Sequence, residues 1–447
     1  MVSGLIVSLL MKVDPAFFFW IMQFYRAQIW LLDTYILGPI FRVTITNGRR
    51  EEEARAKTDY SRSAQIVSVI GRGSYCYAGK HSLDNFFYRH VKYVNPRHVL
   101  KADNITLQGI TPTHAFFCVT PPGDSKTGVY ETEKAPFTYI LQYLMSEQMV
   151  IMPLESLNKL AAEVGDPAVE SLTFVNSTAR CGGTLLCQML ARVPGVQVMS
   201  EPWSLLHLHG HYNQGRIKLP DYRNLIRSIV RIQCKKIHGK STSHIVIKLP
   251  FPCAPQAQIL KLLFPQAKYL FMTRHPKDST LSSLRVFKSF PYIYTSLLAK
   301  AKEFTYEHLP IPYDNDKLQE WRTSFFPTLL YLTRNQRNTA RNYAGAILCY
   351  LENKELYDKA LVYDDLMENP EKEMSSLFML LSLSREHVRL ALKAVVKADP
   401  QSPAVKSKDV IDWAEIDRVY DKEFQLPFNS QSSVNKFKKE IYNGKKL

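Results

Sequence analysis

A strand-to-helix turn at residues 174–186, FVNSTARCGGTLL, carries the residue types that are needed to hold an anion. Its glycines permit dihedral angles that a side chain opposes, so successive backbone N–H groups can point into one concavity at the positive end of the next helix. Phosphate or sulfate is a natural occupant of such a site. The turn offers hydroxyl, guanidinium and backbone donors from Ser177, Thr178, Arg180, Cys181, Gly182, Gly183 and Thr184.

The turn differs from the GxxxxGK(S/T) phosphate loop, because no glycine opens it and no Lys-Ser/Thr pair closes it. ATP or GTP hydrolysis is therefore disfavoured. A plain glycine turn that joins a strand to a helix, with Arg180 exposed, stays open as the alternative.

A second anion signal follows the apolar run KYLFMT at 268–273, which ends directly at Arg274. Pro276 suits the first turn of a helix, and Asp278 suits the positive N-terminal end of that helix. Arg274 and Ser282 can then face the same crevice. The alternative is an ordinary strand-to-helix connection at the surface.

The elements that must position these turns form an alternating pattern of short apolar runs and helical stretches. The apolar runs are LTFVN (172–176), VQVMS (196–200), HIVIK (244–248), KYLFMT (268–273) and ALVY (360–363). Continuous apolar strands that alternate with helices predict an α/β domain with a central parallel sheet flanked by helices on both faces. In such sheets the ligand lies beyond the carboxyl ends of the strands.

The pattern divides the chain into four parts. We expect a membrane-associating apolar helical segment and charged linker at 1–55, an accessory region of mixed structure at 56–165, the α/β domain at 166–430 and a basic tail at 431–447. The first segment contains AFFFWIMQFY at 16–25, but charged residues interrupt it. Residues 1–41 therefore fit a helix at a membrane surface or an imperfect signal-anchor, and a helix packed on the protein is the alternative.

The composition points to an anionic partner without choosing one. The formal net charge is +16, from 57 Lys and Arg against 41 Asp and Glu. A field of that sign attracts anionic ligands and surfaces. The seven cysteines have no CxxC spacing, which argues against a zinc site and a dense disulfide framework.

Four stretches together resemble the sulfotransferase family that uses 3′-phosphoadenosine 5′-phosphosulfate (PAPS). They are TARCGGTLL, the segment TRHPKDSTLSS with Arg274 and Ser282, LVYDDLMENPEKEMSSLFMLL at 361–381, and VPGVQVMSEPWSLL with its acidic Glu201. The resemblance spans about residues 170 to 400 and is nearer to the carbohydrate, Golgi-type branch than to the cytosolic branch.

The resemblance implies a three-layer P-loop-type domain that moves a sulfuryl group from PAPS to a hydroxyl acceptor, such as a glycan. We expect no metal and no nucleic-acid partner, and the hydrophobic N-terminal segment, the basic charge and the arginine in the loop favour a Golgi-membrane location, with a cytoplasmic one also open. Arg180 to Thr184 correspond to the family's 5′-phosphosulfate loop, and Arg274 with Ser282 to its 3′-phosphate grip. Arg180 would stabilise charge in the transfer, and Glu201 would be the general base. A helix cap or salt bridge is the alternative role for Glu201.

The chain also departs from the cytosolic pattern, because Lys248-Leu249-Pro250 lacks the Thr-His pair and no C-terminal Gly-rich loop is visible. A nucleotide-binding protein that has lost transfer activity, a P-loop nucleotide kinase or ATPase, and a membrane-surface scaffold therefore stay open as rivals. His207, His209 and His211 alternate; on a strand they would share one face and could bind metal, but no companion ligands are visible.

Overall fold

The computed structural model describes residues 59–72, 83, 86–121, 137–168, 171–213, 215–235, 242–288, 343 and 345–395. The predictions for the N-terminal segment at 1–55 and the tail at 431–447 lie outside these residues. Within the described ranges, no helix combines the length and the apolar character that crossing a membrane requires.

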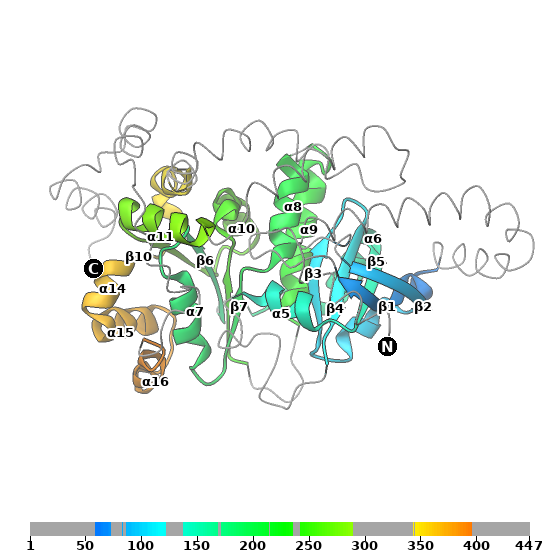
Figure 1. Cartoon of the computed structure of the whole chain (residues 1–447), viewed down its shortest axis with the longest axis horizontal. Coiled ribbons are helices and arrows are strands. Elements are labelled where there is room, and N and C mark those ends of the chain that lie inside the picture. Colours follow the sequence, from blue (N-terminus) through cyan, green and yellow to red (C-terminus); the bar gives the residue numbers. More distant parts are fainter. Residues whose placement is uncertain are drawn as a thin grey trace, which may run out of the picture.

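The centre of the chain forms a five-stranded parallel sheet (Figure 1), as the alternating pattern predicted. Its strands are β6 (Leu172–Ser177), β7 (Val196–Ser200), β8 (His244–Lys248), β9 (Lys268–Thr273) and β10 (Lys359–Val362). They lie in the order β10-β9-β6-β8-β7, so that β6 is in the middle. The α/β class with a parallel sheet is thus confirmed.

Adjacent side chains of each inner strand enter two different hydrophobic cores. On β6, Phe174 belongs to one core and Val175 to the other, and on β8 Ile247 and Val246 divide in the same way. All six residues of β6 are buried. A strand covered on both faces has no polar side to show, which is why these strands read as continuous apolar runs.

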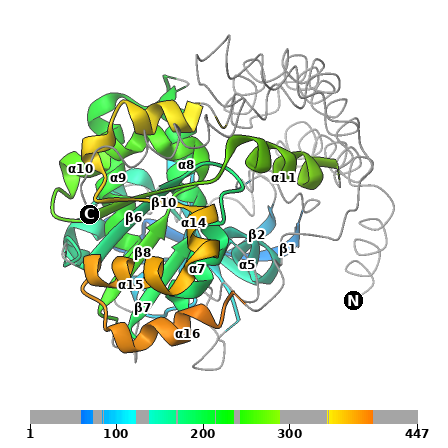
Figure 2. The ribbon, with the colours of Figure 1, turned by 90° about the vertical axis from the view of Figure 1, so that its left-hand side faces the viewer.

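Helices cover both faces of this sheet, and Figure 2 shows α7, α15 and α16 together on the face that is turned toward the viewer. These three helices, Gly183–Ala191, Pro370–Leu380 and Val388–Leu392, contribute to the core that contains Val175. The other helices here are α8 (Trp203–Asn213), α9 (Leu219–Gln233), α10 (Ala257–Leu263), α11 (Pro276–Lys288) and α14 (Tyr363–Glu368), with 3-10 turns η6 (Phe251–Gln256), η7 (Lys354–Leu356) and η8 (Arg385–His387).

A second, antiparallel sheet precedes the parallel one. Its strands, in the order β2-β1-β5-β4-β3, are β1 (Ala64–Arg72), β2 (Phe86–Val94), β3 (Ile105–Ile110), β4 (His114–Val119) and β5 (Gln148–Pro153). Helices α5 (Thr138–Met145) and α6 (Leu154–Val164) and turns η2 (Tyr60–Arg62) and η4 (Pro96–Leu100) complete it.

The two sheets share one hydrophobic core. Leu157 and Leu160 of α6 and Leu225 and Ile229 of α9 belong to it, and α9 follows an amphipathic 3–4 spacing of apolar residues. The buried ammonium of Lys235, just after α9, donates to the carbonyls of Val99, Ala102 and Ile105 at 2.6, 2.9 and 2.6 Å. This lysine therefore holds the η4–β3 connection against α9.

Candidate functional site

The parallel sheet brings five strand ends to one edge, where ligands of such sheets bind. The residues at these ends are Thr178 after β6, Glu201 after β7, Lys248 at the end of β8, Arg274 after β9 and Tyr363 after β10. These five residues are spread over positions 178 to 363 of the sequence, and the sheet brings them together at the carboxyl ends of its strands.

The turn after β6 has the backbone that the glycines predicted. Arg180 and Gly182 adopt left-handed φ angles of 55° and 86°, and α7 begins at Gly183. A Cβ on Gly183 would lie 2.4 Å from Lys248 Cε, so the backbone comes close to the neighbouring strand end. Thr184, the second residue of α7, is half-buried. A non-glycine residue held at positive φ is strained, and such strain concentrates at functional sites.

Three of the predicted residues anchor this turn to the fold. The Thr178 N–H donates to the Met272 carbonyl at 3.0 Å, and the Thr178 hydroxyl donates to Thr273 Oγ1 at 3.5 Å. Ser177 is buried at the end of β6, and the buried Cys181 side chain packs in the core below α7. Burial raises the pKa of the Cys181 thiol. Cys181 can therefore offer a ligand only its backbone N–H.

The structure brings together Arg180 and Ser282, which are 102 positions apart. Arg180 Nε donates to Ser282 Oγ at 3.0 Å. The hydroxyl of Ser279, one turn earlier on α11, donates to the Ala179 carbonyl. Helix α11 therefore packs directly against the turn after β6, and the two predicted anion-binding segments form one continuous surface.

Arg274 lies beside this surface with an unused donor. Its guanidinium carbon is 4.6 Å from the centre of the Tyr363 ring, in cation–π contact. The Tyr343 hydroxyl donates to the Arg274 carbonyl at 2.6 Å and fixes the main chain there. Arg274 Nε is buried and has no hydrogen-bond partner within the described ranges. A buried charged donor without a partner is costly, and an anionic ligand would satisfy it.

Glu201 is paired with Lys248 across the other half of the edge. Lys248 Nζ donates to Glu201 Oε1, and the two side chains are 5% and 18% exposed. Burial alone would lower the pKa of the Lys248 ammonium, but the nearby Glu201 carboxylate raises it above its ordinary value. Glu201 has a left-handed φ of 54°, and its N–H donates to the Lys248 carbonyl at 2.8 Å. The salt bridge considered for Glu201 is thus present, with a strand-end lysine as its partner.

Three residues of this edge are not among the predicted site residues. Lys248 ends the predicted strand HIVIK, so the rule that ligands bind at carboxyl ends could have placed it. Tyr363 follows β10 in the same way. Phe137 comes from the accessory region, with its ring centre 5.5 Å from Lys248 Nζ. No sequence signal connects it to the site, because the contact exists only after the two sheets have packed together.

The three alternating histidines do not lie on a strand. They belong to α8, whose apolar residues Leu205 and Leu208 at helical spacing pack in the core. His209 Nδ1 hydrogen-bonds the Tyr222 hydroxyl at 3.0 Å, and burial lowers the pKa of its ring. In the part of the chain that the structure describes, no three His, Cys, Asp or Glu side chains are grouped to hold a metal ion.

Comparison with known proteins finds a family similarity in the part of the chain that forms the parallel sheet. Residues 173–387 match the model of a sulfotransferase family, and the matched stretch contains Arg180, Glu201, Lys248, Arg274 and Ser282. This finding supports the predicted resemblance to sulfotransferases. No curated protein matches the chain.

Several solved sulfotransferase structures resemble parts of the fold at low identity. That of Alicyclobacillus acidocaldarius is 16% identical with a TM-score of 0.28, and the match covers 51% of this chain and 86% of that one. STF1 of Mycobacterium tuberculosis H37Rv is 14% identical with a TM-score of 0.34, covering 54% and 77%. STF9 of Mycobacterium avium is 14% identical with a TM-score of 0.33, covering 55% and 73%.

Proposed function

Because residues 173–387 match a sulfotransferase family, we propose that this protein transfers a sulfuryl group from PAPS to a hydroxyl acceptor. The observation that carries this proposal is the buried, unpartnered Nε of Arg274 beside the contact between Arg180 and Ser282. It supports a donor with two anionic groups, one held after β6 and one after β9.

In this proposal the donor's 5′ end lies in the turn after β6. Arg180 and the backbone N–H groups of Gly182, Gly183 and Thr184 would stabilise charge on its oxygens. Arg274 and Ser282 would bind the 3′-phosphate, since a guanidinium fork and a hydroxyl both donate to such an oxyanion. A mononucleotide that carries phosphates only at its 5′ end would leave Arg274 and Ser282 without a ligand group to bind.

The acceptor side would be formed by Glu201 and Lys248. Sulfuryl transfer, like phosphoryl transfer, needs positioning and electrostatic stabilisation more than covalent help from the protein. The Glu201 carboxylate would accept the proton of the acceptor hydroxyl, and Lys248 would keep that carboxylate in place. Phe137 would close the site from the accessory side and reduce the access of water.

We further propose a glycan acceptor and a location at a membrane surface, most simply that of the Golgi, reached through residues 1–41. The likeness of the Glu201 segment to carbohydrate-type members and the net charge of +16 support an acidic glycan. Membrane partition of the full chain, compared with a chain that lacks residues 1–41, tests the location. Equal partition of the two chains would contradict it.

Isothermal titration of the full chain with adenosine 3′,5′-bisphosphate, AMP and ATP tests the donor site. We expect the bisphosphate to bind much more tightly than AMP, and Arg274→Ala to weaken it by about 30- to 150-fold, since a hydrogen bond to a charged group is worth about 2–3 kcal/mol. Arg274→Ala should leave AMP binding unchanged, because AMP has no 3′-phosphate. Arg223→Ala, at an exposed arginine of α9, is the matched control. Equal binding of the three nucleotides would refute the donor assignment.

A transfer assay separates the enzyme from its rivals. One rival in particular is a protein that binds the nucleotide without transferring the sulfuryl group. The pairing of Glu201 with Lys248 favours this rival, because the carboxylate of the proposed base is already occupied by the lysine. Release of adenosine 3′,5′-bisphosphate from PAPS, with or without a glycan acceptor, would identify an active enzyme. Tight bisphosphate binding without any release would favour the inactive protein, and turnover of Mg-ATP would favour a kinase.

A further inference from the structure

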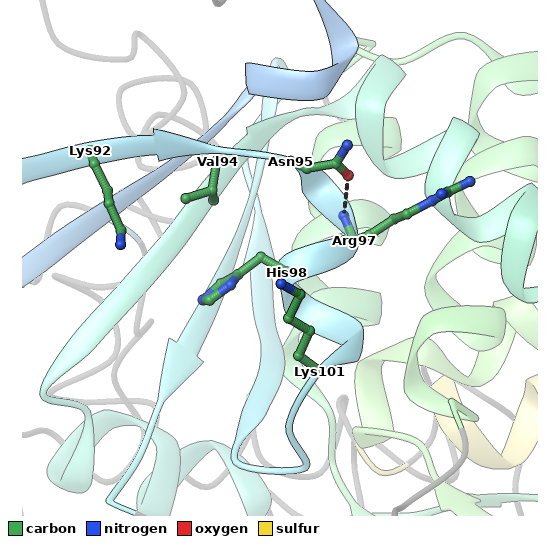
Figure 3. A pocket seen from close by; sticks show the side chains of 6 residues that line it. All are labelled: Lys92, Val94, Asn95, Arg97, His98 and Lys101. Atoms are coloured by element: carbon green, nitrogen blue, oxygen red, sulfur yellow. Dashed lines mark hydrogen bonds between the residues drawn. The ribbon is translucent and has the colours of Figure 1, made fainter.

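A cavity of about 500 Å³, half open to solvent, lies beside the accessory sheet, between the end of β2 and the turn η4. Figure 3 shows the six residues that line it: Lys92, Val94, Asn95, Arg97, His98 and Lys101. None of the six is acidic, and none belongs to the strand-end site described above. Its volume is within the range of pockets that bind small organic molecules, and it far exceeds the space needed by a single ion.

Three cationic or titratable side chains converge on this cavity. Lys92 reaches in from β2, His98 approaches from η4, and Lys101 follows directly after η4; all three lie below the apolar side chain of Val94 in the view of Figure 3. Arg97 extends in another direction, where its Nε donates to Glu163 Oε2 at 2.6 Å. Among the described residues, no carboxylate lies within ion-pair distance of Lys92 Nζ or Lys101 Nζ. Their charges are therefore not cancelled by a described acidic neighbour.

The ring of His98 lies close to the two lysine ammonium groups and is partly buried. Its pKa lies below the ordinary value because of burial first, and then because of the ammonium groups of Lys101 and Lys92. An anion between these groups would relieve their repulsion and favour the charged imidazole. The pKa of His98 should then rise on binding.

The backbone that carries these groups is held rigidly. Asn95 Oδ1 accepts the Arg97 N–H at 2.9 Å, and Pro96 and Val99 are buried beneath the turn. Lys235 binds the carbonyl of Val99 from below. The cationic side chains therefore start from a fixed backbone, which lowers the entropy lost when a ligand binds.

We propose that this cavity binds the sulfate or phosphate ester group of a sugar-sized ligand. The ester oxygens would accept hydrogen bonds from Lys92, Lys101 and His98, while Val94 and the aliphatic lysine stems would contact the sugar. The site would act independently of the donor site, because the two share no residue.

Titration of the full chain with glucose 6-sulfate, glucose 6-phosphate, inorganic sulfate and glucose tests this site. We expect both esters to bind at least tenfold more tightly than glucose and inorganic sulfate. Lys92→Gln and Lys101→Gln should each weaken the esters by about tenfold, the loss expected for one charge-assisted contact. Lys159→Gln, at an exposed lysine of α6 that pairs with Glu155, should change nothing. A pH titration followed by NMR should show a higher pKa of the His98 ring when either ester fills the site. The ring signal of His98 is assigned by its absence from the spectrum of His98→Asn.

Arg274→Ala distinguishes this site from the donor site, since it should leave ester binding intact even if bisphosphate binding is lost. Equal affinity for glucose and its esters would overturn the proposal. So would esters that bind as before to both lysine variants, or esters that Arg274→Ala abolishes. If inorganic sulfate binds as tightly as glucose 6-sulfate, the proposal that the cavity also contacts the sugar is wrong.

Discussion

Replacing Gly182 by alanine should damage the fold and the donor site together. Gly182 has a left-handed φ of 86°, where an alanine costs about 1 kcal/mol. An added Cβ would also lie 2.2 Å from Tyr363 Cδ2 and 2.7 Å from Cε2. The half-buried Tyr363 ring can shift only in part, so we expect a further cost of about 1–2 kcal/mol from overpacking. The free energy of unfolding should fall by about 2–3 kcal/mol in total.

Gly215→Ala supplies the matched control. Gly215 has a comparable φ of 71°, but no atom lies within 4 Å of the position that its Cβ would take. This variant should pay only the backbone cost of about 1 kcal/mol. Urea denaturation followed by tryptophan fluorescence gives the loss of free energy of unfolding for both variants. The excess loss in Gly182→Ala measures the cost of the steric clash with the Tyr363 ring.

A double-mutant cycle with Tyr363→Ala completes the test. If the ring causes the extra cost, Gly182→Ala should be about 1–2 kcal/mol less destabilising in the Tyr363→Ala background. Since the same ring contacts the Arg274 guanidinium, Gly182→Ala should also weaken adenosine 3′,5′-bisphosphate binding. The reasoning is refuted if Gly182→Ala and Gly215→Ala cost the same, or if the cycle shows no coupling.

Three further changes probe the buried polar groups. Burial lowers the pKa of His244 in the folded protein to about 4, from 6.5, and its Nε2 hydrogen-bonds Thr173 Oγ1 at 2.8 Å. Between these two pKa values the unfolded chain binds a proton at His244 that the folded protein does not bind. The free energy of unfolding should therefore be at its full value above pH 6.5 and fall by about 3 kcal/mol as the pH drops to about 4. Urea denaturation measures this fall, which should be smaller in His244→Gln. Lys235→Met should lower the free energy of unfolding by about 3 kcal/mol, because three carbonyls, two of them buried, lose a charged donor. Lys159→Met should have little effect in the same denaturation experiment. Glu201→Gln should slow single-turnover sulfuryl transfer by at least about 100-fold while bisphosphate affinity changes less than about threefold; unchanged transfer would remove Glu201 as the base.

The parallel sheet could be read from the sequence because its strands are covered on both faces. The runs VQVMS, HIVIK and KYLFMT coincide residue for residue with β7, β8 and β9. A strand between two helical layers has only apolar neighbours, so its limits are visible as changes in composition. The same pattern predicted that Arg274 and the turn at 178–182 follow strands directly, and the structure has them at the carboxyl ends of β9 and β6.

The accessory sheet could not be read in this way. Its pairing joins β1 to β5, with Gln65 opposite Ile151, across a long stretch of chain. Such a pairing depends on packing between distant segments, which no local pattern encodes. The alternation of His207, His209 and His211 is equally uninformative by itself, because Leu205 and Leu208 carry the helical spacing that decides the structure of this segment.

The charges at the sheet edge divide into two groups that suit two different tasks. The Arg274 guanidinium contacts an aromatic face, which does not cancel its charge, and Arg180 Nε donates to the Ser282 hydroxyl. These arginines follow the adjacent strands β9 and β6, so an anion that spans both turns would meet both guanidinium groups. Lys248 and Glu201, after β8 and β7, neutralise each other instead. A pair with no net charge is poorly suited to attract an anion. We therefore infer that an anionic ligand binds at the half of the edge formed by β9 and β6, and that the Glu201–Lys248 pair occupies the other half, with the boundary between β6 and β8.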